Sequence, residues 1–218
     1  MFADPVAELA LTLALMGLRG MATYAPAISW ERPEGHNLVD GSVTVVGGGG
    51  IATSLVRMLE PFGAHVTVVR RTDTPFPGVD RTVTTAQLDD VLPGSDVVVL
   101  ALPLTPETEG VVDERRLRLL PGHAWLVNVA RGRHVVTDDL VTVLADGVIG
   151  GAGLDVTDPE PLPDGHPLWA MPNCFITPHV GNTPEMAVPL LSAQVRDNVR
   201  RFHAGDELVG LIDVGAGY

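Results

Sequence analysis

Three charged side chains in the second half of the chain each follow an apolar segment. Arg131 follows WLVNVA, Glu160 comes shortly after GAGLDV, and His179 follows CFITP. If these segments are parallel strands, the three side chains gather at one edge of a sheet, where open parallel sheets bind ligands. A guanidinium can hold an anionic substrate there, while an imidazole beside a carboxylate can move a proton. We therefore predict a catalytic site formed by Arg131, Glu160 and His179.

Each of these residues also has an ordinary interpretation. An arginine beside a glycine is usually on the surface, a glutamate between prolines is usually a solvated turn residue, and a lone histidine is usually structural. The predicted common edge of the sheet is what favours a site. The remaining histidines lack such a setting, and we assign them to structural or surface roles: His36, His65, His123, His134, His166 and His203.

Composition excludes several classes of function. The chain has 218 residues, a hydrophobic fraction of 45% and a formal net charge of -13, which is typical of a globular protein that repels nucleic-acid backbones. All 14 basic residues are arginine, so reactions that need a lysine are excluded. The single cysteine, Cys174, allows no internal disulfide and no cysteine-rich metal site, so we expect a core role for it, no metal centre and a cytoplasmic location.

The amino-terminal segment is apolar but does not fit a secretion signal or a membrane span. Acidic residues occupy the place where a signal needs positive charge, and the apolar run is too short to cross a bilayer. Helical spacing predicts a buried helix over Pro5 to Arg19. The residues from Ala25 to Gly41 contain prolines and polar side chains and are interpreted as a connector.

From residue 42 onward, short apolar segments alternate with helical patterns, which predicts a Rossmann-type doubly wound α/β fold with a parallel sheet of about six strands. We expect strands at Val43–Val46, His65–Val69, Asp96–Leu102, Ala124–Val129, Gly151–Val156 and Cys174–Thr177. Helices are expected at Ile51–Glu60, near Thr85–Leu92, and at Asp113–Leu120, Thr137–Ala145 and Pro184–His203. Thr137 and Thr183 are expected to cap the helices that they precede or begin, and Gly147 to end one. The predicted organisation is a connecting helix and linker (1–41), a dinucleotide-binding domain (42–182) and a carboxyl-terminal helix with a tail (183–218).

A glycine-rich turn lies between the first predicted strand and the next helix. Gly47 permits the turn, Gly49 lets the backbone approach a pyrophosphate, and the small Ala52 lets helix and strand pack closely. Amide groups at the start of the helix, around Gly50 and Ile51, can stabilise phosphate charge. A flexible glycine loop is the alternative, but the position of the motif between strand and helix favours dinucleotide binding.

The end of the second predicted strand indicates which dinucleotide is used. An acidic residue there accepts hydrogen bonds from the adenosine ribose of NAD, but this chain has Arg70 and Arg71. Arginine can pair with the 2′-phosphate of NADP instead, so we predict NAD(P)H as cofactor with NADPH preferred over NADH. Two solvated surface arginines are the alternative.

The chain resembles the D-isomer-specific 2-hydroxyacid dehydrogenase family over nearly its whole length. The matching segments are VAELALTLAL, VVGGGGIA, LALPLTPETEG, LVNVARG, LDVTDPEPLP, HPLWAMPN, ITPHVGNTPEM and DNVRRFHAG. The resemblance implies that Arg131 binds the substrate carboxylate and polarises its carbonyl, and that Glu160 holds the acid-base His179. It also implies a cofactor-contact set that adds Leu102, Pro103, Thr108, Val129, Ala130, Asp155 and Gly181 to the glycine turn and its arginines. A protonated histidine would stabilise the charge that develops on the carbonyl oxygen of a 2-oxo acid as hydride arrives.

One departure from the family pattern matters. Members of the family normally begin with a substrate domain, which we expect to be absent from this chain, leaving the last helix with nothing to pack on. Loss of that domain would expose the site to water and reduce the rate. Two hypotheses follow: an oxidoreductase for a small 2-oxo or 2-hydroxy acid, or a dinucleotide-binding or regulatory module without turnover. We also expect a homodimer formed through the nucleotide-binding domain.

Overall fold

The computed structural model describes residues 3–211 and contains one seven-stranded sheet in which every neighbouring pair of strands is parallel. The strand order is β3-β2-β1-β4-β5-β6-β7. The strands are β1 (Ser42–Val46), β2 (His65–Arg70), β3 (Arg81–Thr84), β4 (Val97–Leu100), β5 (Trp125–Asn128), β6 (Gly151–Leu154) and β7 (Cys174–Ile176). The order reverses between β1 and β4, which confirms a Rossmann-type doubly wound α/β fold.

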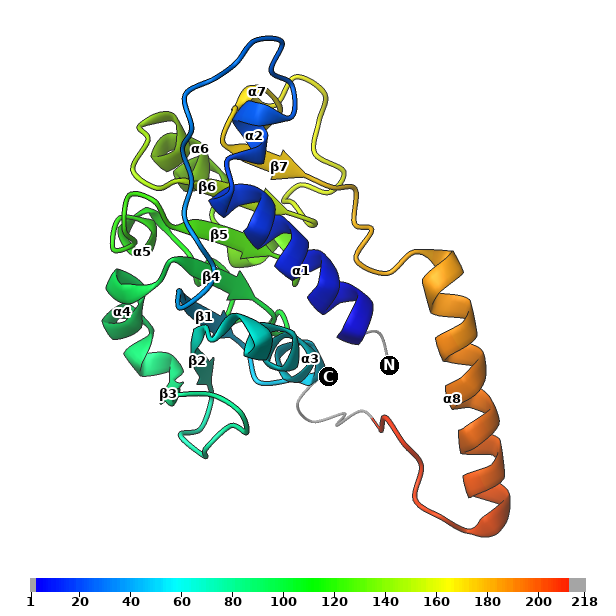
Figure 1. Cartoon of the computed structure of the whole chain (residues 1–218). Coiled ribbons are helices and arrows are strands. Elements are labelled where there is room, and N and C mark those ends of the chain that lie inside the picture. The colour runs from blue at the N-terminus through cyan, green and yellow to red at the C-terminus, as the bar shows by residue number, and fades with distance from the viewer. Residues whose placement is uncertain (1–2, 212–218) are drawn as a thin grey trace.

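Helices cover both faces of this sheet (Figure 1). The helices are α1 (Ala3–Leu18), α2 (Met21–Tyr24), α3 (Gly50–Leu59), α4 (Leu88–Val91), α5 (Glu114–Leu117), α6 (Thr137–Ala145), α7 (Pro167–Ala170) and α8 (Pro184–Ala204). One buried cluster contains residues of α1 and α3, and a second contains residues of α4, α5 and α6. The strands contribute to both clusters, as expected for short apolar strands buried on two faces.

Glycines let α1 lie close to the sheet. A side chain at Gly17 would meet the ring of Trp125 at 2.2 Å, and one at Gly153 would meet Leu13 at 2.9 Å. The carboxylate of Asp4 accepts hydrogen bonds from Ser54 and Arg57 of α3. The first helix is therefore part of the sheet's packing, which confirms the expectation that it is buried.

Three sequence expectations were wrong in detail, and one concerns Thr183: it occupies the N-cap position of α8, but its side chain makes no capping hydrogen bond. The sheet has seven strands and not six, because Arg81–Thr84 forms an edge strand in which only Val83 is buried. An edge strand needs no continuous apolar run, so the pattern gave no indication of it. Thr137 does not cap α6: the cap position is Val136, and the Thr137 hydroxyl donates to the Asp158 carbonyl at 2.7 Å. Gly147 does follow the end of that helix with a positive φ.

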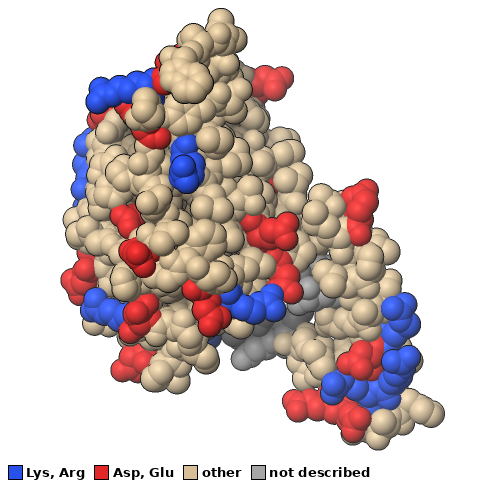
Figure 2. Space-filling model, in the orientation of Figure 1, with Lys and Arg blue, Asp and Glu red and all other residues tan. Residues whose placement is uncertain are grey.

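The last helix stands apart from the sheet (Figure 1). None of the residues of α8 is buried, and its apolar side chains include the exposed Met186, Leu191, Val195 and Phe202. Figure 2 shows that the charged side chains of α8 gather toward its carboxyl-terminal half. No helix within residues 3–211 is long and apolar enough to cross a membrane.

Candidate active site

The site lies at the carboxyl edge of the sheet, where one row of paired residues ends the central strands. Val46 of β1 pairs with Leu100 of β4, which pairs in turn with Asn128 of β5. Asn128 then pairs with Leu154 of β6, and Leu154 with Ile176 of β7. Every predicted site residue apart from Arg70 and Arg71, at the end of β2, lies within eight residues after this row on its own chain segment. The parallel sheet thus delivers the predicted residues to one edge.

The glycine turn after β1 has the shape that a dinucleotide requires. Gly47 has a φ of 124°, and a side chain there would meet the Ala101 carbonyl oxygen at 2.1 Å, so the turn packs directly on the end of β4. Gly49 directly precedes α3 at its N-cap position, provides no side chain to cap the helix, and has open space where a side chain would be. The amides at the start of α3, including those of Gly50 and Ile51, therefore have no capping side chain as an acceptor. A helix amino terminus of this kind favours the binding of an anion. These residues fit a bound pyrophosphate.

Arg70 lies beside that turn. Its Cδ and Nε atoms are 3.3 Å from the position of a side chain at Gly48, and its guanidinium carbon is 6.0 Å from the centre of the Phe76 ring. Arg71 follows directly and is exposed. The structure therefore places a cation next to the glycine turn at the end of β2, as the sequence predicted.

The loop after β4 is held by the hydroxyl of Thr108. This hydroxyl donates to the Pro103 carbonyl at 2.8 Å and accepts from the Thr105 amide at 2.8 Å. Leu102, just before Pro103, packs against the larger buried cluster. The predicted cofactor loop is thus a turn with fixed internal hydrogen bonds.

Arg131 follows β5 through a short turn that Asn128 orders. The side-chain oxygen of Asn128 accepts from the Ala130 amide at 3.1 Å, and its nitrogen donates to the Arg131 carbonyl at 2.9 Å. Val129 and Ala130 are buried, whereas Arg131 is exposed. Within residues 3–211 the guanidinium of Arg131 donates only to the Ala130 carbonyl, at 2.6 Å. Its other donors remain available to an anionic ligand.

Glu160 and His179 form the pair that the sequence predicted. His179 Nδ1 lies 2.7 Å from Glu160 Oε1, and the two side chains are 49% and 43% exposed. A carboxylate only accepts, so Nδ1 carries the proton and Nε2 is left for a substrate. His179 has a φ of 55°, which is uncommon for a residue with a side chain, and its amide donates to the carbonyls of Asp155 and Thr177.

Asp155 holds the loop that carries His179. Its buried carboxylate accepts hydrogen bonds from the Thr177 hydroxyl at 2.6 Å, the Val180 amide at 2.8 Å and the Gly181 amide at 2.9 Å. A side chain at Gly181 would lie 3.3 Å from Val6 of α1. The resemblance predicted a cofactor contact for Asp155. The structure shows that its carboxylate also holds the loop that carries His179.

Comparison with known proteins shows the family to which the chain belongs. The family model described as D-isomer specific 2-hydroxyacid dehydrogenase, NAD binding domain, matches residues 9–181. The chain belongs to this dehydrogenase family. The sequence is 42% identical over the whole chain, and over 74% of the other protein, to an uncharacterized protein in the proB 3′ region of Corynebacterium melassecola. It is 34% identical over 97% of the chain to glyoxylate/hydroxypyruvate reductase A of Photorhabdus laumondii, of which it covers 68%.

Solved structures of the dehydrogenase family superpose on the whole chain. An NADPH-dependent glyoxylate/hydroxypyruvate reductase from Sinorhizobium meliloti, in complex with NADP and sulfate, is 31% identical with a TM-score of 0.89. A probable 2-hydroxyacid dehydrogenase from Rhizobium etli, in complex with NADP, HEPES and L(+)-tartaric acid, is 32% identical with a TM-score of 0.89. In both cases this chain covers 70% of the other chain.

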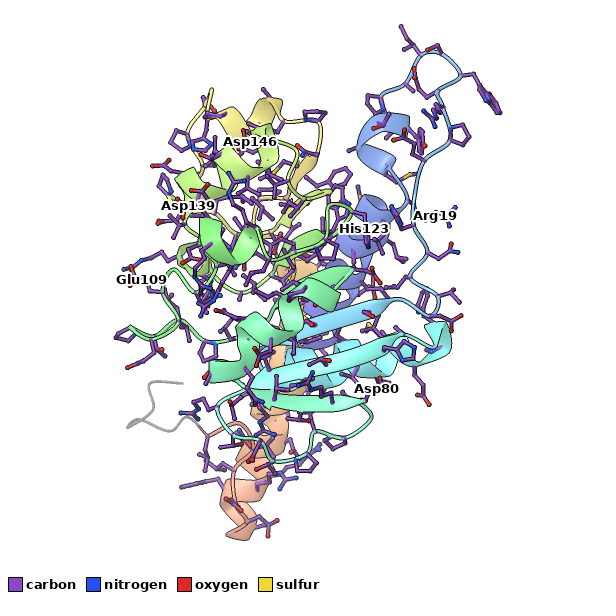
Figure 3. The ribbon with its side chains drawn as sticks, turned by 90° about the vertical axis from the view of Figure 1, so that its left-hand side faces the viewer. Arg19, Asp80, Glu109, His123, Asp139 and Asp146 are labelled. Atoms are coloured by element: carbon purple, nitrogen blue, oxygen red, sulfur yellow. The ribbon has the colours of Figure 1, made fainter. Side chains whose placement is uncertain are left out.

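Two side chains of the candidate site were not predicted from the sequence. Asn128 is buried in the turn before Arg131, and His134, assigned to a structural or surface role, is fully buried between the loops after β4 and β5. The outer parts of these loops are joined by the ion pair of Arg133 with Glu109 at 2.6 Å. Figure 3 shows Glu109 and His123 at opposite ends of the strands. Glu109 lies in the loop after β4, and His123 precedes β5. The pattern NVARGRH could have indicated His134 only if the turn geometry had been known.

Proposed function

We propose that this chain is an oxidoreductase that transfers hydride between NAD(P)H and a small 2-oxo or 2-hydroxy acid, with NADPH preferred. The observation that carries the proposal is the 2.7 Å pair of His179 and Glu160, at the same sheet edge as Arg131 and the glycine turn. Support comes from relatives described as glyoxylate/hydroxypyruvate reductases and from solved family structures with NADP bound. One of those structures also contains tartaric acid, which is a 2-hydroxy acid.

In this proposal, the glycine turn and the start of α3 hold the cofactor's pyrophosphate, and Arg70 with Arg71 pairs with the 2′-phosphate. The residues Leu102, Pro103, Thr108, Val129, Ala130, Asp155 and Gly181 line the remainder of the cofactor site. When bound, the cofactor supplies or accepts the hydride. The rest of the chemistry belongs to side chains of this chain.

Arg131 binds the substrate carboxylate through two parallel N–H donors, which fixes the direction in which the carbonyl faces. As an imidazolium with a proton on each ring nitrogen, His179 donates the Nε2 proton to the carbonyl oxygen as negative charge develops there, and is left neutral with its Nδ1 proton. Glu160 accepts from Nδ1–H and so keeps the ring oriented with Nε2 toward the substrate. In the oxidative direction, Nε2 takes the hydroxyl proton back.

The open geometry of the site bears on its efficiency. His179 and Glu160 are about half exposed, and no residue of α8 is buried. We propose that a substrate-binding domain packs against α8, closes over this pair and excludes water, either in the same polypeptide or as a separate partner. We further propose a homodimer formed through the nucleotide-binding domain, to which the adjoining connector contributes Ile28 and Trp30, two fully exposed apolar side chains.

The test is NADPH oxidation with glyoxylate, hydroxypyruvate or phenylpyruvate, measured for the wild type and for His179→Asn. His203→Asn is the matched control, since His203 is an exposed histidine of α8. We expect turnover that falls by about 10²- to 10⁴-fold in His179→Asn and is unchanged in the control, with NADPH binding intact in both variants. The chain can also be fused to the amino-terminal domain of a longer relative and measured again. If both proteins bind NADPH and neither turns over substrate, the result would favour a dinucleotide-binding module over an oxidoreductase.

A further inference from the structure

We propose that His134 is a positioning residue of this site, whose ring sets the separation between Arg131 and the loop that begins at Pro103. The inference rests on the proposed function, in which Arg131 holds the substrate and this loop faces the cofactor. His134 is a histidine that the proposed proton transfer does not use, and its side chain has no exposed surface.

Both ring nitrogens of His134 contact backbone of the two loops. Nδ1 lies 3.2 Å from the Arg131 amide nitrogen and 3.0 Å from the Arg131 carbonyl oxygen. Nε2 lies 3.3 Å from the Pro103 carbonyl oxygen. Both nitrogens of a buried polar ring need hydrogen-bond partners. Here Nδ1 has its partners on Arg131, the proposed substrate-binding residue, and Nε2 has its partner on Pro103, in the proposed cofactor loop.

The contacts select one tautomer. If Nε2 carries the proton, it donates to the Pro103 carbonyl while Nδ1 accepts from the Arg131 amide, so two of the three contacts are hydrogen bonds. With the proton on Nδ1, the ring would donate to the Arg131 carbonyl alone, because the Arg131 amide would lose its acceptor and the bare Nε2 would face the Pro103 carbonyl oxygen without a donor. Burial lowers the pKa of His134 by more than its contacts with the Pro103 and Arg131 carbonyls raise it, and the charge of Arg131 adds to the lowering, which favours the neutral ring. A neutral ring with Nε2–H acts as a spacer with one acceptor and one donor.

This contact extends a connection that the backbone makes only farther out. Three backbone hydrogen bonds join the outer parts of the two loops. The amide of residue 110 donates to the carbonyl of residue 133, that of 112 to 134, and that of 136 to 112. That ladder ends before Pro103. The Pro103 carbonyl accepts instead from His134 and from the Thr108 hydroxyl, so these two side chains fix the inner end of the loop. Because the outer ladder does not depend on the ring, the loops can stay paired when the ring is replaced.

Two substitutions separate the two contacts. In His134→Asn the amide oxygen can replace Nδ1 and accept from Arg131, but the side chain is too short to reach Pro103. In His134→Gln the amide nitrogen can replace Nε2 and donate to Pro103, but no acceptor remains for Arg131. We expect an approximately five-fold higher KM for NADPH with an unchanged KM for glyoxylate in the Asn variant, and the opposite in the Gln variant. His203→Asn should change neither constant.

The outcomes distinguish this inference from the proposed function. If the wild type turns over and both variants raise the two KM values equally, or only lower the melting temperature, His134 is merely structural and the inference fails while the function stands. If the wild type binds NADPH but does not turn over, the same split is sought in the Kd values for NADPH and for oxalate as an analogue of the acid. A wild type that binds neither ligand overturns the proposed function itself. Should both variants fail to fold, the ¹⁵N spectrum of His134 in the wild type decides, because a proton on Nδ1 would contradict the spacer geometry.

Discussion

The carboxylate of Asp155 accepts a hydrogen bond from the amide of Gly181 at 2.9 Å, although the two residues follow different strands. The same carboxylate also accepts from Thr177 and Val180, and the Asp155 carbonyl accepts from the amide of His179. Asp155 is therefore the residue through which the end of β6 holds the proposed acid-base residue after β7.

Replacing Asp155 with asparagine is expected to loosen that loop. The amide nitrogen of asparagine cannot accept, so at least one donor at residues 177, 180 or 181 loses its partner in a buried place, at a cost of about 1–3 kcal/mol. We expect a lower free energy of unfolding in urea and a lower kcat than the wild type. Asp146→Asn, at an exposed position after α6, is the control. Equal stability of the Asp155 variant and the wild type would contradict the bracing role.

The glycine turn allows a matched pair of alanine substitutions. Gly47→Ala places a methyl group 2.1 Å from the Ala101 carbonyl at a φ of 124°, so we expect a loss of at least about 3 kcal/mol of stability. Gly49→Ala places its methyl group in open space at a φ of -94°, where the fold tolerates it. The second variant should keep its melting temperature but bind NADPH more weakly, because the methyl group occupies the proposed pyrophosphate position. Fluorescence titration and thermal melts separate the two effects, and unchanged NADPH affinity in Gly49→Ala would argue against binding at this turn.

The sequence was most informative where local pattern and topology coincide. Gly47 and Gly49 lie between a buried strand and a helix, and Glu160 and His179 follow neighbouring strands, so their placement follows from the rules of parallel sheets. The edge strand at Arg81–Thr84 escaped detection, because one buried valine is too weak a pattern.

The contacts between loops could not be read from the sequence. Gly132 packs so closely on the loop after β6 that a side chain there would meet the Thr157 carbonyl at 1.9 Å, yet nothing in the sequence relates residues 132 and 157. His134 was assigned to a structural or surface role for the same reason: its partners at Arg131 and Pro103 are set by how two loops fold together. The second task of Asp155 also depends on a loop 22 to 26 residues further along the chain.

The two arginines after the glycine turn offer a test of cofactor choice. Arg70→Gln removes the cation that lies against Gly48, and should raise the KM for NADPH by roughly ten-fold while leaving the KM for NADH nearly unchanged. The KM for NADPH of Arg71→Gln shows how much Arg71 contributes to NADPH binding. Arg81→Gln, at the start of β3, is the control for a general loss of positive charge. A wild type that prefers NADH over NADPH would show the assignment of NADPH to be wrong.

The buried ring of His134 should also make stability depend on pH. Burial lowers its pKa below the ordinary value of 6.5, so between the folded and the unfolded pKa the unfolded chain binds a proton that the folded chain does not. Stability is therefore fully retained above about pH 6.5 and falls as the pH drops below that value, until the folded pKa is passed. His134→Asn cannot take up this proton, so the difference in unfolding free energy between wild type and variant should shrink as the pH falls from 7.5 to 5. Urea unfolding at a series of pH values measures that difference directly and cancels the shared contribution of the other histidines. A difference that stays constant over this range would mean that His134 is protonated equally in both states, which would contradict a neutral spacer between Arg131 and Pro103.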